Sequence, residues 1–385
     1  MSFQLMTAAA AGLYKRSNFD ASDALGAIAK RSAESGKQDL SVSLLNALIG
    51  LVVVNIVVWL PVFVFLCYTV GTLFPTLAAV EDETPPPSYE RVSLKEDVEK
   101  NDGAKKVKAD VEEEEGGLLR SRPVTSGFFA IFRLLRSIGG WRSLFRGISC
   151  ASAANTVALL IALVVSAVPY VPVAVGLAVG SLATVQLSTA WLHIVMTAPR
   201  PEPFWRRLPG LRATFRATAL PTLVVNVAIL LAYELPAPLL HAMGLETVEG
   251  SVPGMITSAD GSSLAKDLAV VLVQLLVLFF FSVPACVVLL RCQASLLPAE
   301  DASRTIVSFD RAFGLEGENG PHERGYVTMI EAWRTFSGAA WRRLVVLYVK
   351  IILFTFAVEM VIINLFFLQV RVVTLNVVRS ANVSS

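Results

Sequence analysis

Charged residues are scarce in this sequence of 385 residues. They make up 17% of the chain, against about 25% in soluble domains, while 54% of the residues are hydrophobic. This balance excludes a soluble enzyme and a disordered scaffold. Four cysteines are too few for the framework of a disulfide-rich secreted domain. A net charge of only +2 gives no reason to expect a nucleic-acid partner.

The groups that usually carry chemistry are also sparse. The three histidines, His193, His241 and His322, lie in separate regions, so no metal-ligand spacing can be recognised. The sequence contains no Walker loop, no glycine-rich dinucleotide turn and no Gly-x-Ser-x-Gly elbow. The cysteines lie in or beside apolar runs, where a thiolate is disfavoured. We therefore expect no enzymatic activity, no metal and no cofactor.

Long hydrophobic runs dominate the chain. A membrane-spanning helix needs about 20 mostly apolar residues, and six runs qualify, at 44–78, 150–169, 172–196, 218–236, 266–297 and 344–370. The first, fifth and sixth runs exceed this length, so we expect tilt, a proline kink at Pro61 or Pro284, or continuation past the bilayer. The sequence predicts an all-α integral membrane helical bundle of about six spans, with the lipid bilayer as its principal partner.

The polar stretches divide the chain further. Its expected parts are a disordered polar tail 1–42, the first span 43–79, a disordered acidic loop 80–123, an interfacial helix with spans two to four 124–236, a loop 237–265, spans five and six with their intervening loop 266–372, and a tail 373–385.

Basic residues are distributed unevenly between the two sides of this topology. The side that holds the loops 79–149, 197–217 and 298–343, with the flanking Arg291 and Lys350, carries 25 of the 33 Lys and Arg residues. The positive-inside rule places these three loops in the cytosol, or in the matrix for a mitochondrial inner-membrane protein. Because the first 40 residues contain acids as well as bases, they do not look like a transit peptide. We therefore favour an endomembrane or the plasma membrane over the mitochondrial inner membrane.

The acidic loop contains one short motif, Pro86-Pro87-Ser88-Tyr89. A polyproline turn followed by tyrosine resembles the PPxY ligands of WW domains, including those of membrane-associated ubiquitin ligases. This resemblance implies that Pro86, Pro87 and Tyr89 bind a WW-domain partner. Five nearby lysines would then be acceptors: Lys95, Lys100, Lys105, Lys106 and Lys108. The alternative is that a proline-rich acidic linker contains the tetrapeptide by chance.

A degenerate repeat follows the basic loops. Residues 139–147 and 209–217 share Gly, a central Arg and then Phe-Arg before an apolar run, and 337–343 is a looser copy. Amphipathic segments at 128–138 and 326–336 have the spacing of helices that lie in the membrane interface. This pattern predicts three degenerate two-helix repeats with interfacial amphipathic helices.

These repeats resemble the mitochondrial carrier family. The proline, arginine and glutamine of its odd-numbered helices match Pro284, Arg291 and Gln293, with Pro61 and Gln186 as the other repeat anchors. Cys286 and Leu289 replace its charged pair, so the resemblance implies a carrier-like architecture more than the family's charge-based switch. The alternative is that Pro, Gly and Arg recur at helix ends in any polytopic protein.

The chain as a whole also resembles an uncharacterised fungal family of multi-spanning membrane proteins, through residues 291–298 and 309–311. Members of that family have been labelled "ubiquitin carrier". A ubiquitin-conjugating enzyme is a soluble α/β domain with a His-Pro-Asn tripeptide near its cysteine, and no run of this sequence matches it.

Polar side chains inside the apolar runs are the remaining site candidates, because they cost free energy in lipid. The residues that would line a substrate cavity are Gln186, His193, Asn226, Gln274 and Glu359. Their alternative role is hydrogen bonding between helices. The leading hypothesis is therefore a polytopic membrane protein of carrier-like architecture that moves a small solute. The alternative is a non-transporting adaptor or scaffold that recruits a WW-domain ubiquitin ligase.

Overall fold

The computed structural model describes residues 38–82, 127–236, 271–315 and 320–384, together with Thr125, Pro238 and Ala269. These parts are helical, and the pairing of Thr197 with Thr305 is the one β-bridge found within them. Five of the helices are long and apolar enough to cross a membrane, and a bent pair makes a sixth candidate. The chain is thus an all-α membrane helical bundle of about six spans, as the sequence predicts.

The chain divides into two compact units. The first comprises residues 72–232 and 276–348, and the second comprises 2–71, 233–275 and 349–385. The core of the first unit is formed by α4 (Phe74–Val80), α9 (Val185–Met196) and α13 (Val283–Ser295), each of which contacts the other two. Their side chains at Leu77, Leu192 and Cys292 are fully buried.

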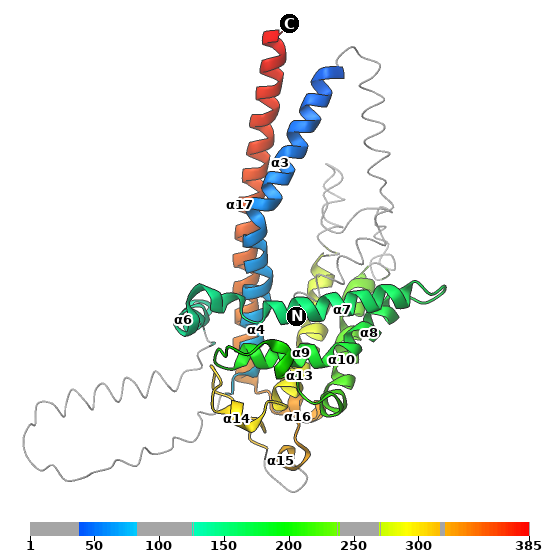
Figure 1. Cartoon of the computed structure of the whole chain (residues 1–385), viewed down its shortest axis with the longest axis vertical. Coiled ribbons are helices and arrows are strands. Elements are labelled where there is room, and N and C mark those ends of the chain that lie inside the picture. Colours follow the sequence, from blue (N-terminus) through cyan, green and yellow to red (C-terminus); the bar gives the residue numbers. More distant parts are fainter. Residues whose placement is uncertain are drawn as a thin grey trace, which may run out of the picture. The chain divides into compact units, whose positions relative to one another are not determined.

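A tight helical hairpin belongs to the same unit. Helices α7 (Ile148–Ser166) and α8 (Val173–Ala183) lie side by side (Figure 1). Gly176 and Gly180 of α8 are buried, and a methyl group added at Gly180 would collide with the Ala158 carbonyl of α7. A small-xxx-small pattern lets two helix backbones approach this closely in a membrane.

The expected third span, 172–196, is not one straight helix. Helices α8 and α9 meet at a bend of 57°. Thr184 lies at the break, and its hydroxyl donates to the Gly180 carbonyl at 3.0 Å. The bent pair is therefore a broken span, or a re-entrant segment.

Two further spans are distorted immediately before a proline. The π-helix η1 (Phe65–Leu73) precedes Pro75, and the π-helix η5 (Leu278–Ser282) precedes Pro284. Proline has no N–H and its ring clashes with the carbonyl four residues earlier, so a wider turn at that point relieves the clash. The expected distortion at Pro284 is found, whereas α3 (Gln38–Val64) continues through Pro61.

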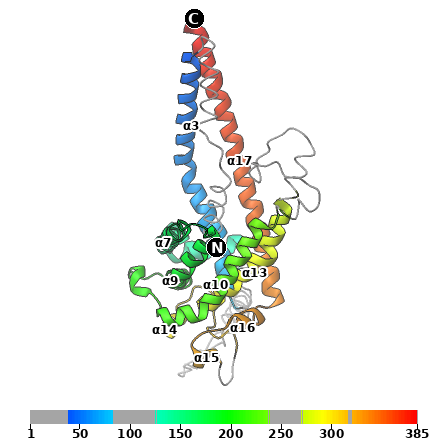
Figure 2. The same cartoon turned by 90° about the vertical axis from the view of Figure 1, so that its right-hand side faces the viewer.

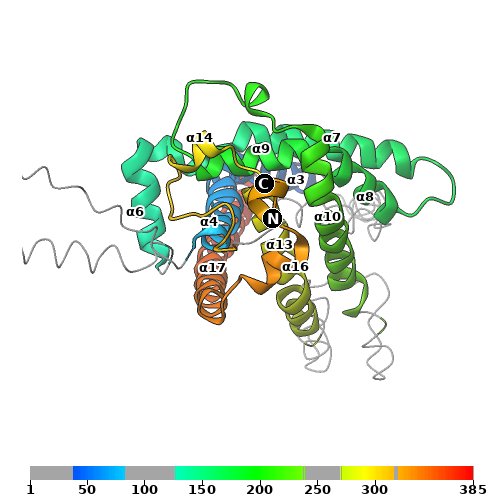
Figure 3. The ribbon, with the colours of Figure 1, turned by 90° about the horizontal axis from the view of Figure 1, so that it is seen from below.

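Helices η5 and α13 also lie beside α10 (Leu211–Glu234) within the first unit (Figure 3). The hydroxyl of Ser282 donates to the Ala228 carbonyl of α10 at 3.1 Å. Both residues are buried, so this bond joins two apolar helices where water is excluded.

In the second unit, α3 runs along the later part of α17 (Gly338–Ser384), as Figure 2 shows. The Asn55 amide donates to Gln369 Oε1 at 2.7 Å. Helix α17 has 47 residues and is therefore about 70 Å long, more than twice the thickness of a bilayer's hydrocarbon core. Helix α3 begins inside the predicted tail 1–42, and α17 continues through most of the predicted tail 373–385.

The remaining elements of the first unit are short. The expected amphipathic helix at 128–138 is present as α6 (Phe128–Gly139), which buries Ile131 and Leu135 and leaves Arg133 and Arg136 exposed. The others are η3 (Gly140–Phe145), η4 (Phe204–Arg207), α14 (Ala299–Ala302), α15 (Pro321–Arg324) and α16 (Met329–Arg334).

The two best copies of the sequence repeat differ in structure. In the first copy, Gly140 has φ +64° and opens the 3₁₀ helix η3, and Gly147 then precedes α7. In the second copy, Gly210 lies directly before the first turn of α10, and its φ is not positive. The shared residues therefore occupy non-equivalent local structures in these two segments.

Candidate functional site

The three basic loops meet in the first unit. The amide of Ala198 donates to the Arg304 carbonyl at 2.8 Å, and the amide of Ile306 donates to the Met196 carbonyl at 2.8 Å. Asp82 is joined to Ser308 by two bonds, one from the Asp82 amide and one from the Ser308 hydroxyl, each 2.9 Å long. We call residues 81–82, 146, 197–207, 301–308 and 343 the loop junction. Its existence places the described ends of all three basic loops together, as a six-span topology requires.

A buried carboxylate anchors one side of the loop junction. Glu81 follows α4 and is 2% exposed. Its carboxylate accepts hydrogen bonds from the backbone amide and hydroxyl of Thr125, the amide bond being 3.1 Å long. Arg343 lies 3.5 Å from the same carboxylate oxygen. A buried carboxylate is stable only when it is paired and hydrogen-bonded, and both conditions are met here.

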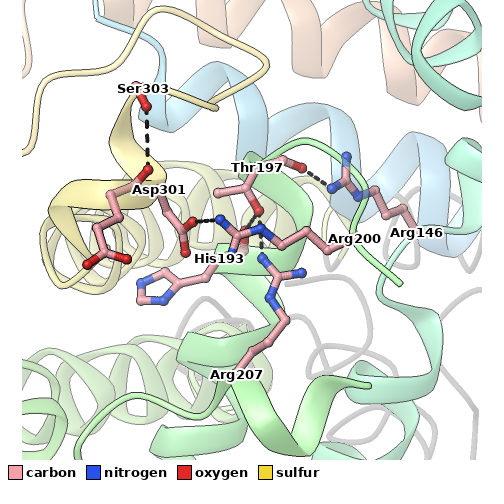
Figure 4. A network of polar contacts seen from close by, with 8 residues as sticks. Arg146, His193, Thr197, Arg200, Arg207, Asp301 and Ser303 are labelled. Atoms are coloured by element: carbon pink, nitrogen blue, oxygen red, sulfur yellow. Dashed lines mark hydrogen bonds and ion pairs between the residues drawn. The ribbon is translucent and has the colours of Figure 1, made fainter. Parts of the chain in front are cut away.

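Three arginines gather around Thr197 on the other side (Figure 4). Thr197 caps the C-terminus of α9 and is 1% exposed. Arg146 donates to its carbonyl, and Arg207 donates to its hydroxyl at 2.8 Å. Arg200 forms an ion pair with Asp301, next to these two guanidinium groups. Cations at a helix C-terminus also complement the helix dipole.

Charges of both signs act on Arg207. Burial lowers the pKa of Arg207, and repulsion from Arg200 lowers that pKa further. The carboxylates of Asp301 and Glu202 act in the opposite direction on the same group. Arg207 therefore lies in a half-buried position with one cationic and two anionic side chains acting on it.

The buried His193 belongs to the contact between α9 and α13. Its Nε2 lies 3.0 Å from the Gln293 carbonyl oxygen, and the Gln293 amide donates to Ser188 at 3.0 Å. Two bonds thus connect these core helices in the same place. Gln293 and His193 have a hydrogen-bonding role that does not require a cavity.

Arg291 has a different environment from the loop-junction arginines. Its guanidinium lies 3.7 Å from the centre of the Phe313 ring and donates to the Thr335 hydroxyl at 2.9 Å. The side chain is 3% exposed. Arg291 therefore connects the end of α13 to the third basic loop through a cation–π contact and a hydrogen bond.

The five predicted cavity residues are divided between the two units. In the first, Gln186 donates to the Pro209 carbonyl at 2.7 Å, and Asn226 donates to the Ser181 hydroxyl at 2.7 Å, while His193 has the contact described above. In the second, Gln274 is half-buried and Glu359 is exposed on α17. The first three residues have the contacts expected of bonds between helices or between a helix and a loop.

The predicted PPxY residues Pro86, Pro87 and Tyr89 lie outside the described residues, as do the neighbouring lysines. What the structure does describe is both ends of the segment that contains them. Glu81 and Asp82 precede the segment and belong to the loop junction, and Thr125 follows the segment and is bonded to Glu81.

Sequence reasoning missed the residues that organise the loop junction. Glu81 looked like one more acid at the start of an acidic loop, and Thr197 and Asp301 carried no motif. Glu81 directly follows Leu77-Ala78-Ala79-Val80 at the end of the first apolar run, but nothing in the sequence indicates that its carboxylate is buried.

The contacts of the loop junction are ion pairs and hydrogen bonds between charged and polar side chains and the backbone. Among the residues that the structure describes, no three His, Cys, Asp or Glu side chains group as metal ligands would. No protein-family model, curated protein or solved structure matches the chain. The polar contacts of the loop junction are therefore the basis for inferring a function.

Proposed function

We propose that this polytopic membrane protein is an adaptor that displays its 83–124 segment to a WW-domain protein. The observation that carries the proposal is the fixing of both ends of that segment. Thr125 is bonded to the buried Glu81 carboxylate, and Asp82 is bonded twice to Ser308. The two ends are thereby anchored to the helical core that the membrane spans provide.

This arrangement suits recruitment at a membrane surface. The PPxY motif begins shortly after Asp82, so its tether to the core is short, and the five lysines lie between the motif and Thr125. A short tether keeps a bound ligase close to these lysines and raises its effective concentration there. The positive-inside rule supports a cytosolic position, where WW-domain ligases are found.

The test uses the full chain in lipid nanodiscs and purified WW domains. We expect a WW domain to bind the wild-type chain, and Tyr89→Ala to weaken binding at least tenfold because the tyrosine pocket is left empty. Ser88→Ala is the matched control, since the third PPxY position carries no defined side-chain requirement. Equal binding by wild type and Tyr89→Ala would refute the adaptor proposal.

The same proposal places the chain in an endomembrane or the plasma membrane. Protease protection of the 83–124 segment in cells, with a tag at the C-terminus, tests this placement. Cleavage of the segment from the cytosolic side is expected. A mitochondrial location with a protected segment would separate the motif from every cytosolic ligase and refute the placement.

Movement of a small solute is a second candidate, favoured by Glu359. This carboxylate lies in an apolar window of α17, and none of the ion pairs found within the described ranges includes it. It interacts electrostatically with Cys67 of the same unit. Intramembrane carboxylates commonly bind protons or cations.

Proteoliposomes containing the chain and a panel of solutes test this candidate. Flux that depends on a proton gradient and disappears in Glu359→Gln would support transport. Absence of flux across the panel, with unchanged WW-domain binding, would leave the adaptor alone.

A further inference from the structure

The three arginines around Thr197 have the composition of an anion-binding site. The adaptor proposal gives these side chains no role. We propose that Arg146, Arg200 and Arg207 bind a phosphate group, presented by an anionic lipid headgroup or as free phosphate. The site lies where the bent pair α8–α9 ends and the second basic loop begins.

Arg200 and Arg207 have hydrogen-bond donors to spare. A guanidinium carries five N–H donors in a planar fork that matches phosphate oxygens. Among the described contacts, Arg200 uses one hydrogen bond, to Asp301, and Arg207 uses one, to Thr197. Most donors of these two side chains are therefore available to a ligand.

Thr197 holds two of the arginine side chains in place before any ligand binds. Thr197 is buried, and its hydroxyl donates to the His193 carbonyl at 2.8 Å while it accepts from Arg207. It also holds Arg146 through its own carbonyl. Figure 4 shows the Arg146 and Arg207 guanidinium groups bonded to this one residue from two chain segments, with Arg200 held beside them by Asp301. Positions fixed before binding reduce the entropy lost when a ligand arrives.

The cluster also lies in an accessible place. Arg207 is repelled by Arg200 and attracted by Asp301 and the exposed Glu202, and the side chain of Arg200 is 25% exposed. The burial and repulsion that lower the pKa of Arg207 would both be offset by an incoming anion. A phosphate would therefore be attracted to the cluster and could reach it from solvent.

The residues next to the arginine cluster in the sequence are those expected at a membrane interface. Trp205 lies between Arg200 and Arg207 and is 62% exposed, as expected of a tryptophan at the headgroup level. Arg206, Arg212 and Arg216 are exposed nearby in the sequence. An exposed tryptophan among exposed arginines is typical of the membrane interface, where a lipid phosphate on the basic side would meet the cluster.

The experiment measures binding to the full chain purified in an uncharged detergent. The probes are dioctanoyl phosphatidic acid, dioctanoyl phosphatidylcholine and inorganic phosphate, at constant ionic strength. We expect phosphatidic acid to bind in a saturable manner, and the double variant Arg200→Gln/Arg207→Gln to weaken binding at least tenfold, since two charge-assisted contacts are lost. Arg212→Gln/Arg216→Gln removes an equal charge at exposed positions outside the cluster and should change binding less than twofold.

Two further measurements keep the outcome interpretable. Arg207→Lys preserves the charge but not the planar fork, so it should fold normally and still lose several-fold in phosphatidic acid affinity. Inorganic phosphate that competes with the lipid would identify free phosphate as a ligand, whereas lipid binding without competition would identify the headgroup. Unchanged affinity in a folded Arg207→Lys variant would overturn the proposal, as would a loss in Arg212→Gln/Arg216→Gln equal to that in Arg200→Gln/Arg207→Gln.

Discussion

Glu81 and Thr125 are separated by 44 residues of sequence and are joined by two hydrogen bonds to one buried carboxylate oxygen. Arg343, from the start of α17, lies 3.5 Å from the same oxygen. One side chain therefore holds the two ends of a long polar segment and the beginning of the last helix.

Replacing this carboxylate should destabilise the first unit. Glu81→Gln removes the charge that compensates the mostly buried Arg343, and loss of one partner of a buried pair costs about 3 kcal/mol. We expect a lower melting temperature in detergent, and faster proteolysis near Thr125. Glu300→Gln, at an exposed position of the third basic loop, is the control and should melt like wild type.

The close packing of α7 against α8 predicts that the stability of the protein depends strongly on the size of residue 180. Gly180→Ala places a methyl group against the Ala158 carbonyl, and overpacking of this kind costs about 1–3 kcal/mol. Gly210→Ala is the matched control because nothing lies within 4 Å of its added methyl group. Thermal denaturation of both variants provides the comparison, and equal melting temperatures would show that the helices are not closely packed.

The bond between Asn55 and Gln369 should couple α3 to α17 energetically. A double-mutant cycle with Asn55→Ala and Gln369→Ala is expected to give about 0.6–1.7 kcal/mol, the range for such bonds in membranes. Asn55→Ala should reduce stability more than Gln369→Ala does. The Trp59 indole N–H donates to the side-chain oxygen Oδ1 of Asn55 at 3.1 Å and also loses its acceptor in Asn55→Ala. Strictly additive effects would argue against the pairing of these two helices.

The capping box of α16 predicts that the stability of the folded protein depends on pH through the Glu331 carboxyl. Burial raises the pKa of Glu331, but its bonds to Thr328 and Arg324 more than offset this, so the pKa is lowered. A carboxyl whose pKa is lower in the folded state stabilises that state above its unfolded pKa of about 4.3, and this contribution disappears as the pH falls through the folded value.

Melting temperatures between pH 5 and pH 3 test this prediction. The wild type should lose more stability over the range than Glu331→Gln, which cannot titrate there. At pH 7, Thr328→Ala should cost about 1 kcal/mol, because an N-cap hydroxyl is lost. Parallel pH profiles for wild type and Glu331→Gln would show that the ionised Glu331 carboxylate does not stabilise the folded state.

The spans could be predicted because hydrophobicity and length alone determine them. The runs at 44–78 and 218–236 lie within or close to helices of the structure, and the amphipathic α6 followed from the spacing of its apolar residues. The bend at Thr184 could not be predicted, since no proline or glycine occupies that position. The π-helix before Pro75 was missed because Pro61 occupied the more central position in the same run.

The loop junction was less accessible to sequence reasoning. Its contacts join residues that are far apart in the chain, such as Arg146 with Thr197 and Arg200 with Asp301. Such pairs depend on how the helices are packed, which a single sequence does not specify. The glycine pattern of α8, Gly176 and Gly180, was in contrast a readable signal for close packing that the search for repeats overlooked.

The contact between Glu81 and Thr125 also has a consequence for how the gene could be divided. Since the folded core already brings these two residues together, the peptide continuity between them adds little to the structure, and the entropy of closing such a segment changes only slowly with its length. Two separately expressed halves, cut near the middle of residues 83–124, should therefore assemble into one complex in the same membrane. Insertions and deletions in that interval are expected to be tolerated far better than at Glu81 or Thr125 themselves.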